Sequence, residues 1–248
     1  FNWIGKTDTP RLSWGDNGEG QSEAHSDALN NIKTERRGIL LRGMYNIDRT
    51  IKRATASVCG LGLYRFFVNG IECDVGAMAP LETDYRKRVI YDEIDVTALI
   101  RKGNNVFGFE LGNGRYSTRK KYWGWRAKWY GDPMAAMEIK LEYTDGETEV
   151  FKTDETWKTS YSAGTDNCFY DGEHYDARLE QPGWNTADFD DTAWSDAISV
   201  QPPCNNVEKN EYFRIQKIRK LTPERFIEAL FGYWICKFSE NIPGRIKI

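Results

Sequence analysis

The segment of residues 172–178, GEHYDAR, carries two acidic side chains close together, Glu173 and Asp176, with His174 between them. Paired carboxylates can serve as the acid and the base of a catalysed reaction. The segment therefore makes an enzyme one hypothesis for this chain, with Glu173 and Asp176 as its reacting groups.

Asp84 and Tyr85 lie in a polar stretch between two predicted strands. A carboxylate accepts two hydrogen bonds from neighbouring hydroxyl groups of a sugar, and a tyrosine ring stacks on the apolar face of the sugar. This pair is a candidate carbohydrate contact. The alternative is an Asx-type turn, in which the Asp84 side chain orders its own loop.

Asn113 and Arg115 follow a predicted strand, in a turn where Gly112 and Gly114 permit tight backbone geometry. Both side chains would then be placed to donate hydrogen bonds to a carbohydrate. The alternative is a structural turn that is packed by Tyr116.

An aromatic stretch is a third candidate for contact with carbohydrate or with another protein surface. It holds five aromatic residues within nine positions, interleaved with Arg and Lys: Tyr122, Trp123, Trp125, Trp129 and Tyr130. A partly exposed aromatic loop suggests binding, and Trp123 and Trp125 are the residues we select. The alternative is a loop that folds over the edge of the domain and buries its rings.

Metal chemistry has a weak basis in the sequence. Asp188, Asp190 and Asp191 offer the hard oxygen atoms that calcium prefers, but the glycine and the distal glutamate of an EF-hand loop are missing, so we favour a solvated turn. The five cysteines form no CxxC pair and only two histidines are present, which excludes a typical zinc site. We expect free, mostly buried thiols and no metal or cofactor, with calcium as the one open alternative.

Composition limits the class of protein and its partners. The 248 residues are 40% hydrophobic and 14% aromatic, which suffices for one large domain, or for one domain with a smaller companion. The net charge is −3 and the basic cluster Arg119-Lys120-Lys121 is short, so nucleic acid is not an expected partner. No run of about 18 apolar residues occurs, so no membrane span is predicted.

Strand patterns dominate the chain from Gly38 onward. Asn69-Gly70 lies between two apolar runs and predicts a hairpin, because both residues tolerate positive φ. Residues 95–100 predict one helical turn with Asp95 as its N-cap. About ten short strands, with turns about every 8 to 12 residues, predict an all-β fold of the jelly-roll or galactose-binding-like β-sandwich class.

We divide the chain into three regions. Residues 1–37 form a polar extension with a first strand, residues 38–200 form the β-sandwich, and residues 201–248 form a linker and the start of a second β unit. Residues 244–248 alternate like a strand and stop without a turn. Because such an edge is normally paired, we expect the natural polypeptide to continue, or these strands to pair with another sheet.

An ordered set of short motifs resembles the N-terminal region of bacterial α-L-rhamnosidases. Each motif is weak alone, and the resemblance lies in their order and spacing. They are Trp3-Ile4-Gly5, Leu40-Leu41-Arg42, Gly60-Leu61-Gly62-Leu63-Tyr64, Val68-Asn69-Gly70, Pro80, Thr83-Asp84-Tyr85, Lys87-Arg88-Val89, Tyr91, Asp95-Val96-Thr97, Gly103-Asn104-Asn105, Leu111-Gly112-Asn113-Gly114, Trp157-Lys158-Thr159-Ser160, residues 172–178, Gly183-Trp184, Trp194 and residues 238–244.

The resemblance implies a multidomain enzyme that removes terminal α-L-rhamnose from plant glycans and glycosides with inversion. In that family the acid and the base lie on a downstream (α/α)6 barrel, whose acidic motifs have no counterpart here. Some β-sandwich modules of the family bind rhamnose in their loops, with calcium nearby. The substrate class favours a rhamnose-containing glycan as partner and a periplasmic or secreted location.

The resemblance also bears on individual residues. It implies that Tyr175 packs internally and that Asp176 pairs with Arg178. Arg115 and Arg245 stand where the family often has Trp. Arg115 would weaken stacking on a neutral sugar and could favour an acidic one.

We therefore expect a non-catalytic N-terminal β-sandwich of an α-L-rhamnosidase-like hydrolase, which supports a downstream catalytic domain and could bind rhamnose-containing glycans. An autonomous carbohydrate-binding module is the alternative. An independent enzyme that uses Glu173 and Asp176 is the third hypothesis.

Overall fold

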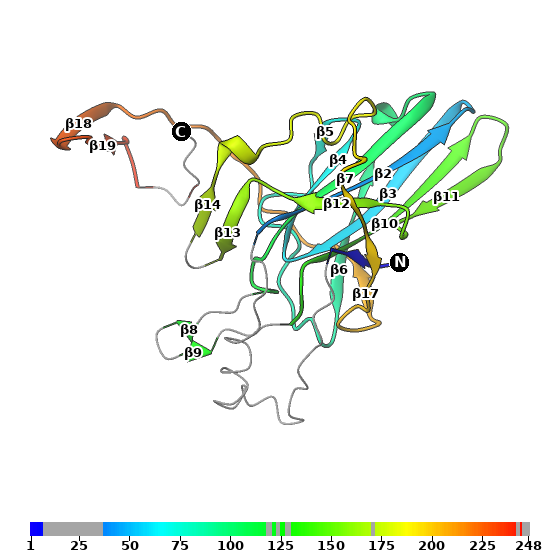
Figure 1. The fold of residues 1–248 in the computed structure, drawn as a ribbon, viewed down its shortest axis with the longest axis horizontal. Helices are drawn as coiled ribbons and strands as arrows, with labels where there is room; N and C mark the ends of the chain where they lie inside the picture. Colours follow the sequence, from blue (N-terminus) through cyan, green and yellow to red (C-terminus); the bar gives the residue numbers. More distant parts are fainter. Residues whose placement is uncertain are drawn as a thin grey trace. The chain divides into compact units, whose positions relative to one another are not determined.

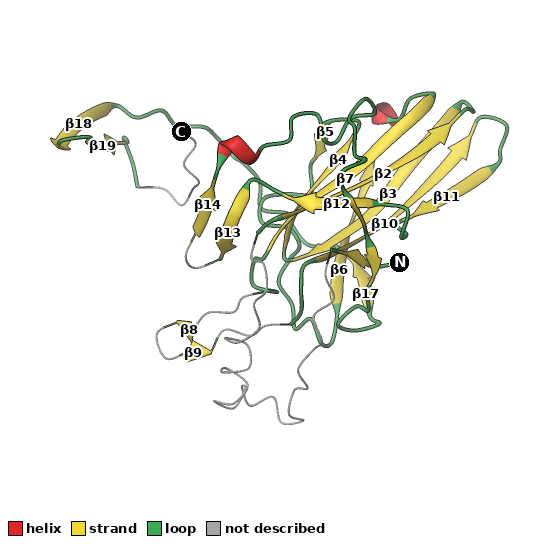
Figure 2. Ribbon diagram, in the orientation of Figure 1, coloured by secondary structure: helices red, strands yellow, loops and turns green. Residues whose placement is uncertain are grey.

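The computed structural model describes residues 1–6, 37–117, 121–122, 125–126, 130–169, 172–241 and 244. The chain divides into two compact units, residues 1–214 and residues 215–248. The first unit contains the sandwich, and the second contains one hairpin. Strands account for nearly all of the regular structure (Figure 2).

The first unit is built on two large sheets (Figure 1). The seven-stranded sheet has the order β16-β1-β10-β3-β6-β17, with β11 paired to β10. Its strands are β1 (Ile4–Gly5), β3 (Ile51–Leu61), β6 (Val89–Asp95), β10 (Met134–Tyr143), β11 (Thr148–Lys152), β16 (Ile198–Ser199) and β17 (Val207–Lys209).

The six-stranded sheet has the order β15-β12-β2-β7-β4-β5. Its strands are β2 (Ile39–Ile47), β4 (Leu63–Val68), β5 (Ile71–Cys73), β7 (Gly103–Gly112), β12 (Lys158–Tyr161) and β15 (Ser195–Asp196). Smaller pairs are β8 (Lys121–Tyr122) with β9 (Trp125–Arg126), β13 (Gly164–Cys168) with β14 (Gly172–Tyr175), and, in the second unit, β18 (Arg225–Leu230) with β19 (Tyr233–Lys237).

A continuous apolar core lies between the two sheets. Successive side chains of a strand point to opposite faces, so β7 sends Phe107, Phe109 and Leu111 into this core, where all three are buried. On the opposite face of β7, Gly108 lies against the indole of Trp184, and a Cβ at this glycine would lie 2.7 Å from that ring. The predicted all-β sandwich is confirmed.

Local turn chemistry was predicted well, with one correction. Asn69 and Gly70 join β4 to β5 with φ angles of 51° and 86°, as the hairpin prediction requires. The predicted helical turn is the short 3-10 helix Thr97–Leu99, but Val96 and not Asp95 occupies its N-cap position. The Asp95 side chain accepts bonds from the backbone and hydroxyl of Thr97 instead, at 2.9 and 2.6 Å.

Residues 201–214 belong to the first unit. β17 pairs in parallel with β6, with Val207 opposite Val89 and Lys209 opposite Tyr91. The first compact unit ends at residue 214. The proline-rich signal at 201–203 marks a turn onto the edge of the sheet, because a strand that follows it finds a pairing partner there.

The second unit carries large apolar side chains that are exposed. Exposed fractions on and next to the hairpin range from 38% at Ile227 to 100% at Phe231. We predicted a strand over residues 244–248, and of these residues 245–248 lie outside the described residues.

The five cysteines are all described, and none forms a disulfide. Cys59 and Cys73 are buried, Cys168 and Cys204 are half-buried, and Cys236 is exposed. The expectation of mostly buried thiols is therefore wrong for the last three. Within the described ranges, no helix has the length and apolar character to cross a membrane.

Candidate functional site

The Asp84 carboxylate is engaged by a neighbouring arginine. It lies in the loop of residues 74–88, between β5 and β6, and accepts bonds from Nε and Nη2 of Arg86 at 2.8 and 2.9 Å. The Asp84 carbonyl also accepts from the amides of Lys87 and Arg88. The bonds from Arg86 lower the pKa of Asp84. This geometry is the turn-ordering alternative, and a sugar would have to compete with Arg86 for the carboxylate.

Tyr85 belongs to a second buried cluster, separate from the core between the two sheets. Its ring is 3% exposed and meets Tyr116 and Tyr130 edge to face, with centroids 5.3 and 5.1 Å away. Burial, ahead of nearby acidic groups, raises its pKa. Stacking on a sugar would require the ring to leave this cluster, so the structure gives Tyr85 a packing role.

Asn113 and Arg115 differ in exposure. Asn113 is buried, and its backbone amide and side-chain amide bond to Asn167 at 2.6 and 3.0 Å. Arg115 is partly exposed, donates to Glu82 at 2.5 Å, and lies over the ring of Phe169 at 5.1 Å. Of these two side chains, only that of Arg115 is partly exposed.

The structure brings these predicted residues to one end of the sandwich. The loop of residues 74–88 meets the turn of residues 113–117 through the tyrosine cluster and through Arg115. Trp123 lies outside the described residues, and for Trp125 only the backbone, at the start of β9, is described. Sequence reasoning did not select Glu82 or Phe169, because an isolated acid and one aromatic in a turn give no distinctive pattern.

The hydrogen bonds of Asp176 differ from those expected of a catalytic acid paired with Glu173. Asp176 accepts two bonds from the guanidinium of Arg178, at 2.8 and 2.6 Å, and caps the short 3-10 helix Ala177–Leu179. These bonds lower the pKa of Asp176, whereas a general acid needs a raised one. The implied Asp176–Arg178 pair is confirmed. Tyr175 is exposed and donates to Glu180, so the expectation that it packs internally is wrong.

The acidic stretch near residue 190 is also engaged within the protein. Asp191 pairs with the buried Arg42, and Asp190 accepts from the amide of Thr192 in a local turn. Across the described residues, no group of three or more His, Cys, Asp or Glu side chains is placed to hold a metal ion. The calcium alternative stays a prediction.

Comparison with known proteins identifies the family. The family model described as the α-L-rhamnosidase N-terminal domain matches residues 49–219. An α-L-rhamnosidase of Formosa agariphila is 33% identical over 211 residues, which cover 84% of this chain and 22% of that protein. This chain belongs to the α-L-rhamnosidase N-terminal domain family.

Solved structures of the family share the fold of this domain. The α-L-rhamnosidase of Dictyoglumus thermophilum is 36% identical, with a TM-score of 0.74, over 83% of this chain and 22% of that one. The Streptomyces avermitilis α-L-rhamnosidase, solved in complex with L-rhamnose, is 27% identical with a TM-score of 0.75, over 80% and 19% of the two chains. The chain spans about a fifth of the length of the curated relatives it matches.

Proposed function

We propose that this chain is the non-catalytic N-terminal region of an α-L-rhamnosidase-like glycoside hydrolase, and that it supports the catalytic part of the same polypeptide. The observation that carries the proposal is the unequal coverage. The alignment with the Formosa agariphila α-L-rhamnosidase covers 84% of this chain but only 22% of that protein. The chemistry of this chain agrees, because Asp176, one of its two candidate reacting groups, is held in an ion pair with Arg178.

The hairpin of the second unit supports a scaffold role. Ile227 pairs with Ile235 on one face, and Phe226 and Trp234 lie on the other. A strand that is apolar on both faces is typical of a sheet covered on both sides, and an isolated hairpin is marginal in water. Further polypeptide of the same protein is the cover that we propose.

The test is Ile235→Lys, introduced both in this chain and in the protein expressed from its complete reading frame. Ile235 lies in the second unit, so the unfolding midpoint of the sandwich in this chain should not change. In the complete protein, both the unfolding midpoint and the hydrolysis of p-nitrophenyl α-L-rhamnoside should fall. Lys237→Gln, on the same strand, is the matched control. An unaffected complete protein would contradict the scaffold role.

Sugar binding is the second candidate function, either within the larger enzyme or as an autonomous carbohydrate-binding module. It is favoured by the partly exposed group of Arg115, Glu82 and Phe169 at the loop end of the sandwich. An aromatic ring beside charged hydrogen-bonding groups suits a pyranose. Calorimetric titration with L-rhamnose, with and without calcium, tests this. Saturable heat supports the candidate, and its absence in both conditions rejects it.

A further inference from the structure

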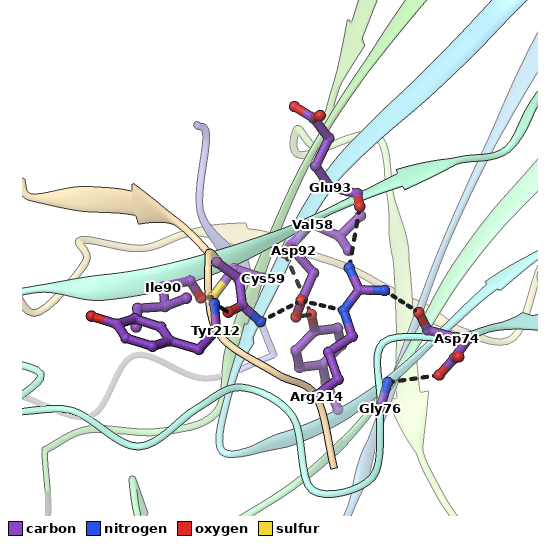
Figure 3. A network of polar contacts seen from close by, with 11 residues as sticks. Val58, Cys59, Asp74, Gly76, Ile90, Asp92, Glu93, Tyr212 and Arg214 are labelled. Carbon is purple, nitrogen blue, oxygen red and sulfur yellow. Dashed lines mark hydrogen bonds and ion pairs between the residues drawn. The ribbon is translucent and has the colours of Figure 1, made fainter. Parts of the chain in front are cut away.

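Asp92 is a carboxylate at an inward-facing position of β6. It is 1% exposed, and burial of a charge is unfavourable unless hydrogen bonds and an opposite charge compensate it. Three side chains supply those bonds: the Tyr64 hydroxyl at 2.7 Å, the Asn210 amide at 2.8 Å and Arg214 Nε at 3.0 Å. Figure 3 shows Arg214 reaching the carboxylate from the segment that leaves the first unit.

Two of these three donors come from residues 206–214, which we name the strap. The strap runs along the edge of β6 as β17. The backbone amide of Asn210, as distinct from its side chain, donates to the Tyr91 carbonyl at 2.8 Å. Arg214 also donates to the carbonyls of Asp74 and Glu93, at 2.9 and 3.2 Å. One guanidinium thus joins the end of the strap to β6 and to the loop after β5 (Figure 3).

Apolar packing does little to hold the strap in place. Tyr212 is 58% exposed and Phe213 is fully exposed, while Val207 is a partly buried side chain packed against the core. The ion pairs Arg88–Glu208 and Lys209–Glu93 are exposed, and such pairs contribute little. The contacts of Asp92 are therefore the strongest side-chain attachment of the strap.

We propose that Asp92 and Arg214 form a latch, which fastens the strap to β6 and fixes the point where the chain leaves the first unit. The dependence is mutual. The strap needs Asp92 as its anchor, and Asp92 needs the strap to keep its charge inside the sandwich. Release of the latch would expose the unpaired edge of β6, and such edges readily pair with other strands. This inference is independent of the proposed function.

Hydrogen exchange on the intact chain tests the latch. The probe is the backbone amide of Asn210, with the Asn69 amide, bonded to the Val106 carbonyl, as the internal reference. Arg214→Gln should speed exchange at Asn210 by about tenfold or more, because it removes the partner of a buried charge. Arg88→Gln, which removes an exposed arginine contact to the strap, should change it by less than about twofold. Equal exchange in the two variants would overturn the latch.

A double variant separates the latch from general stability. Asp92→Asn added to Arg214→Gln removes the uncompensated charge, so the unfolding midpoint should recover towards that of the unaltered chain. Exchange at Asn210 should nevertheless stay fast, because the strap still lacks its ionic anchor. Recovery of both quantities would show that the pair serves only the stability of the fold, and would overturn the proposal. If Arg214→Gln alone does not fold, the double variant carries the measurement.

Discussion

Asn167 accepts hydrogen bonds from both the backbone amide and the side-chain amide of Asn113. The Asn167 side-chain oxygen accepts from the Asn113 backbone amide at 2.6 Å, and its carbonyl accepts from the Asn113 side chain at 3.0 Å. The turn after β7 is thereby tied to β13. Asn113, which we predicted to contact a sugar, therefore also joins two segments of the fold.

Asn167→Ala should destabilise the first unit by about 1–3 kcal/mol, because it removes the acceptor of a buried backbone amide. Urea unfolding followed by tryptophan fluorescence measures the change. Asn46→Ala is the control, since Asn46 bonds to Asn104 at an exposed position and should cost less than about 0.5 kcal/mol. An equal loss of stability in the two variants would show that the hydrogen bonds between Asn113 and Asn167 contribute no more than an exposed pair does.

Gly62 should not tolerate a side chain. Its φ is +115°, and a Cβ would lie 2.0 Å from the carbonyl oxygen of Gly112. Gly146 has a φ of +91° with open space around it, so it shares the backbone strain without the clash. Gly62→Ala should therefore destabilise the protein by about 1–3 kcal/mol more than Gly146→Ala does. Thermal unfolding of the two variants measures the difference, and equal midpoints would contradict this account of the β3–β4 corner.

Arg115 should decide the preference among sugars, if the loop end binds one. Its partly exposed guanidinium lies between Glu82 and Phe169, and an arginine pairs with a carboxylate in two-point geometry. Arg115→Gln should weaken the binding of D-glucuronate by about tenfold and leave the binding of L-rhamnose within about twofold. Calorimetric titration with both sugars checks this. An equal loss for both would assign Arg115 to the shape of the site and not to its selectivity.

The protein should lose stability in alkali. Burial raises the pKa of the Cys59 thiol and of the Tyr64 hydroxyl well above their ordinary values of 9.0 and 10.0, and Asp92 adds to both shifts. The folded state keeps these protons while the unfolded state releases them. The resulting stability is thus complete below about pH 8 and falls as pH rises, by up to about 1.4 kcal/mol per pH unit for each group.

Urea unfolding at about pH 8 and about pH 10.5 measures this loss. Cys59→Ala removes one of the two groups, so the loss of stability between these pH values should become smaller. A free energy of unfolding that stays constant over this range would contradict the assigned burial of both groups.

Features set by local chemistry could be predicted from the sequence. The Asn69-Gly70 hairpin depends on two residues that accept positive φ, and the alternation in β7 depends on the two-residue period of a strand. Features set by distant partners could not. Tyr85 is buried because Tyr116 and Tyr130 arrive from loops far along the chain, and a tyrosine in a polar loop carries no sign of that.

The position of the strap also could not be predicted from the sequence, because it depends on distant partners. Two prolines followed by polar residues are typical of a linker, and Asp92 in an alternating strand reads as a surface residue. Their meeting depends on a contact between residues 122 positions apart in the chain. The resemblance to a known family implied the fold and the Asp176–Arg178 pair, but not the hydrogen bonds that commit Asp84 and Asn113 to partners within the protein.

The most direct test of the central claim is hydrolysis of p-nitrophenyl α-L-rhamnoside by this 248-residue chain beside the protein expressed from its complete reading frame. The account predicts release of nitrophenol by the complete protein and none above the buffer rate by this chain, because Asp176, one of its two candidate reacting groups, is held in an ion pair with Arg178. Hydrolysis by this chain that disappears in Glu173→Gln would contradict it, and would place the catalytic groups within these residues.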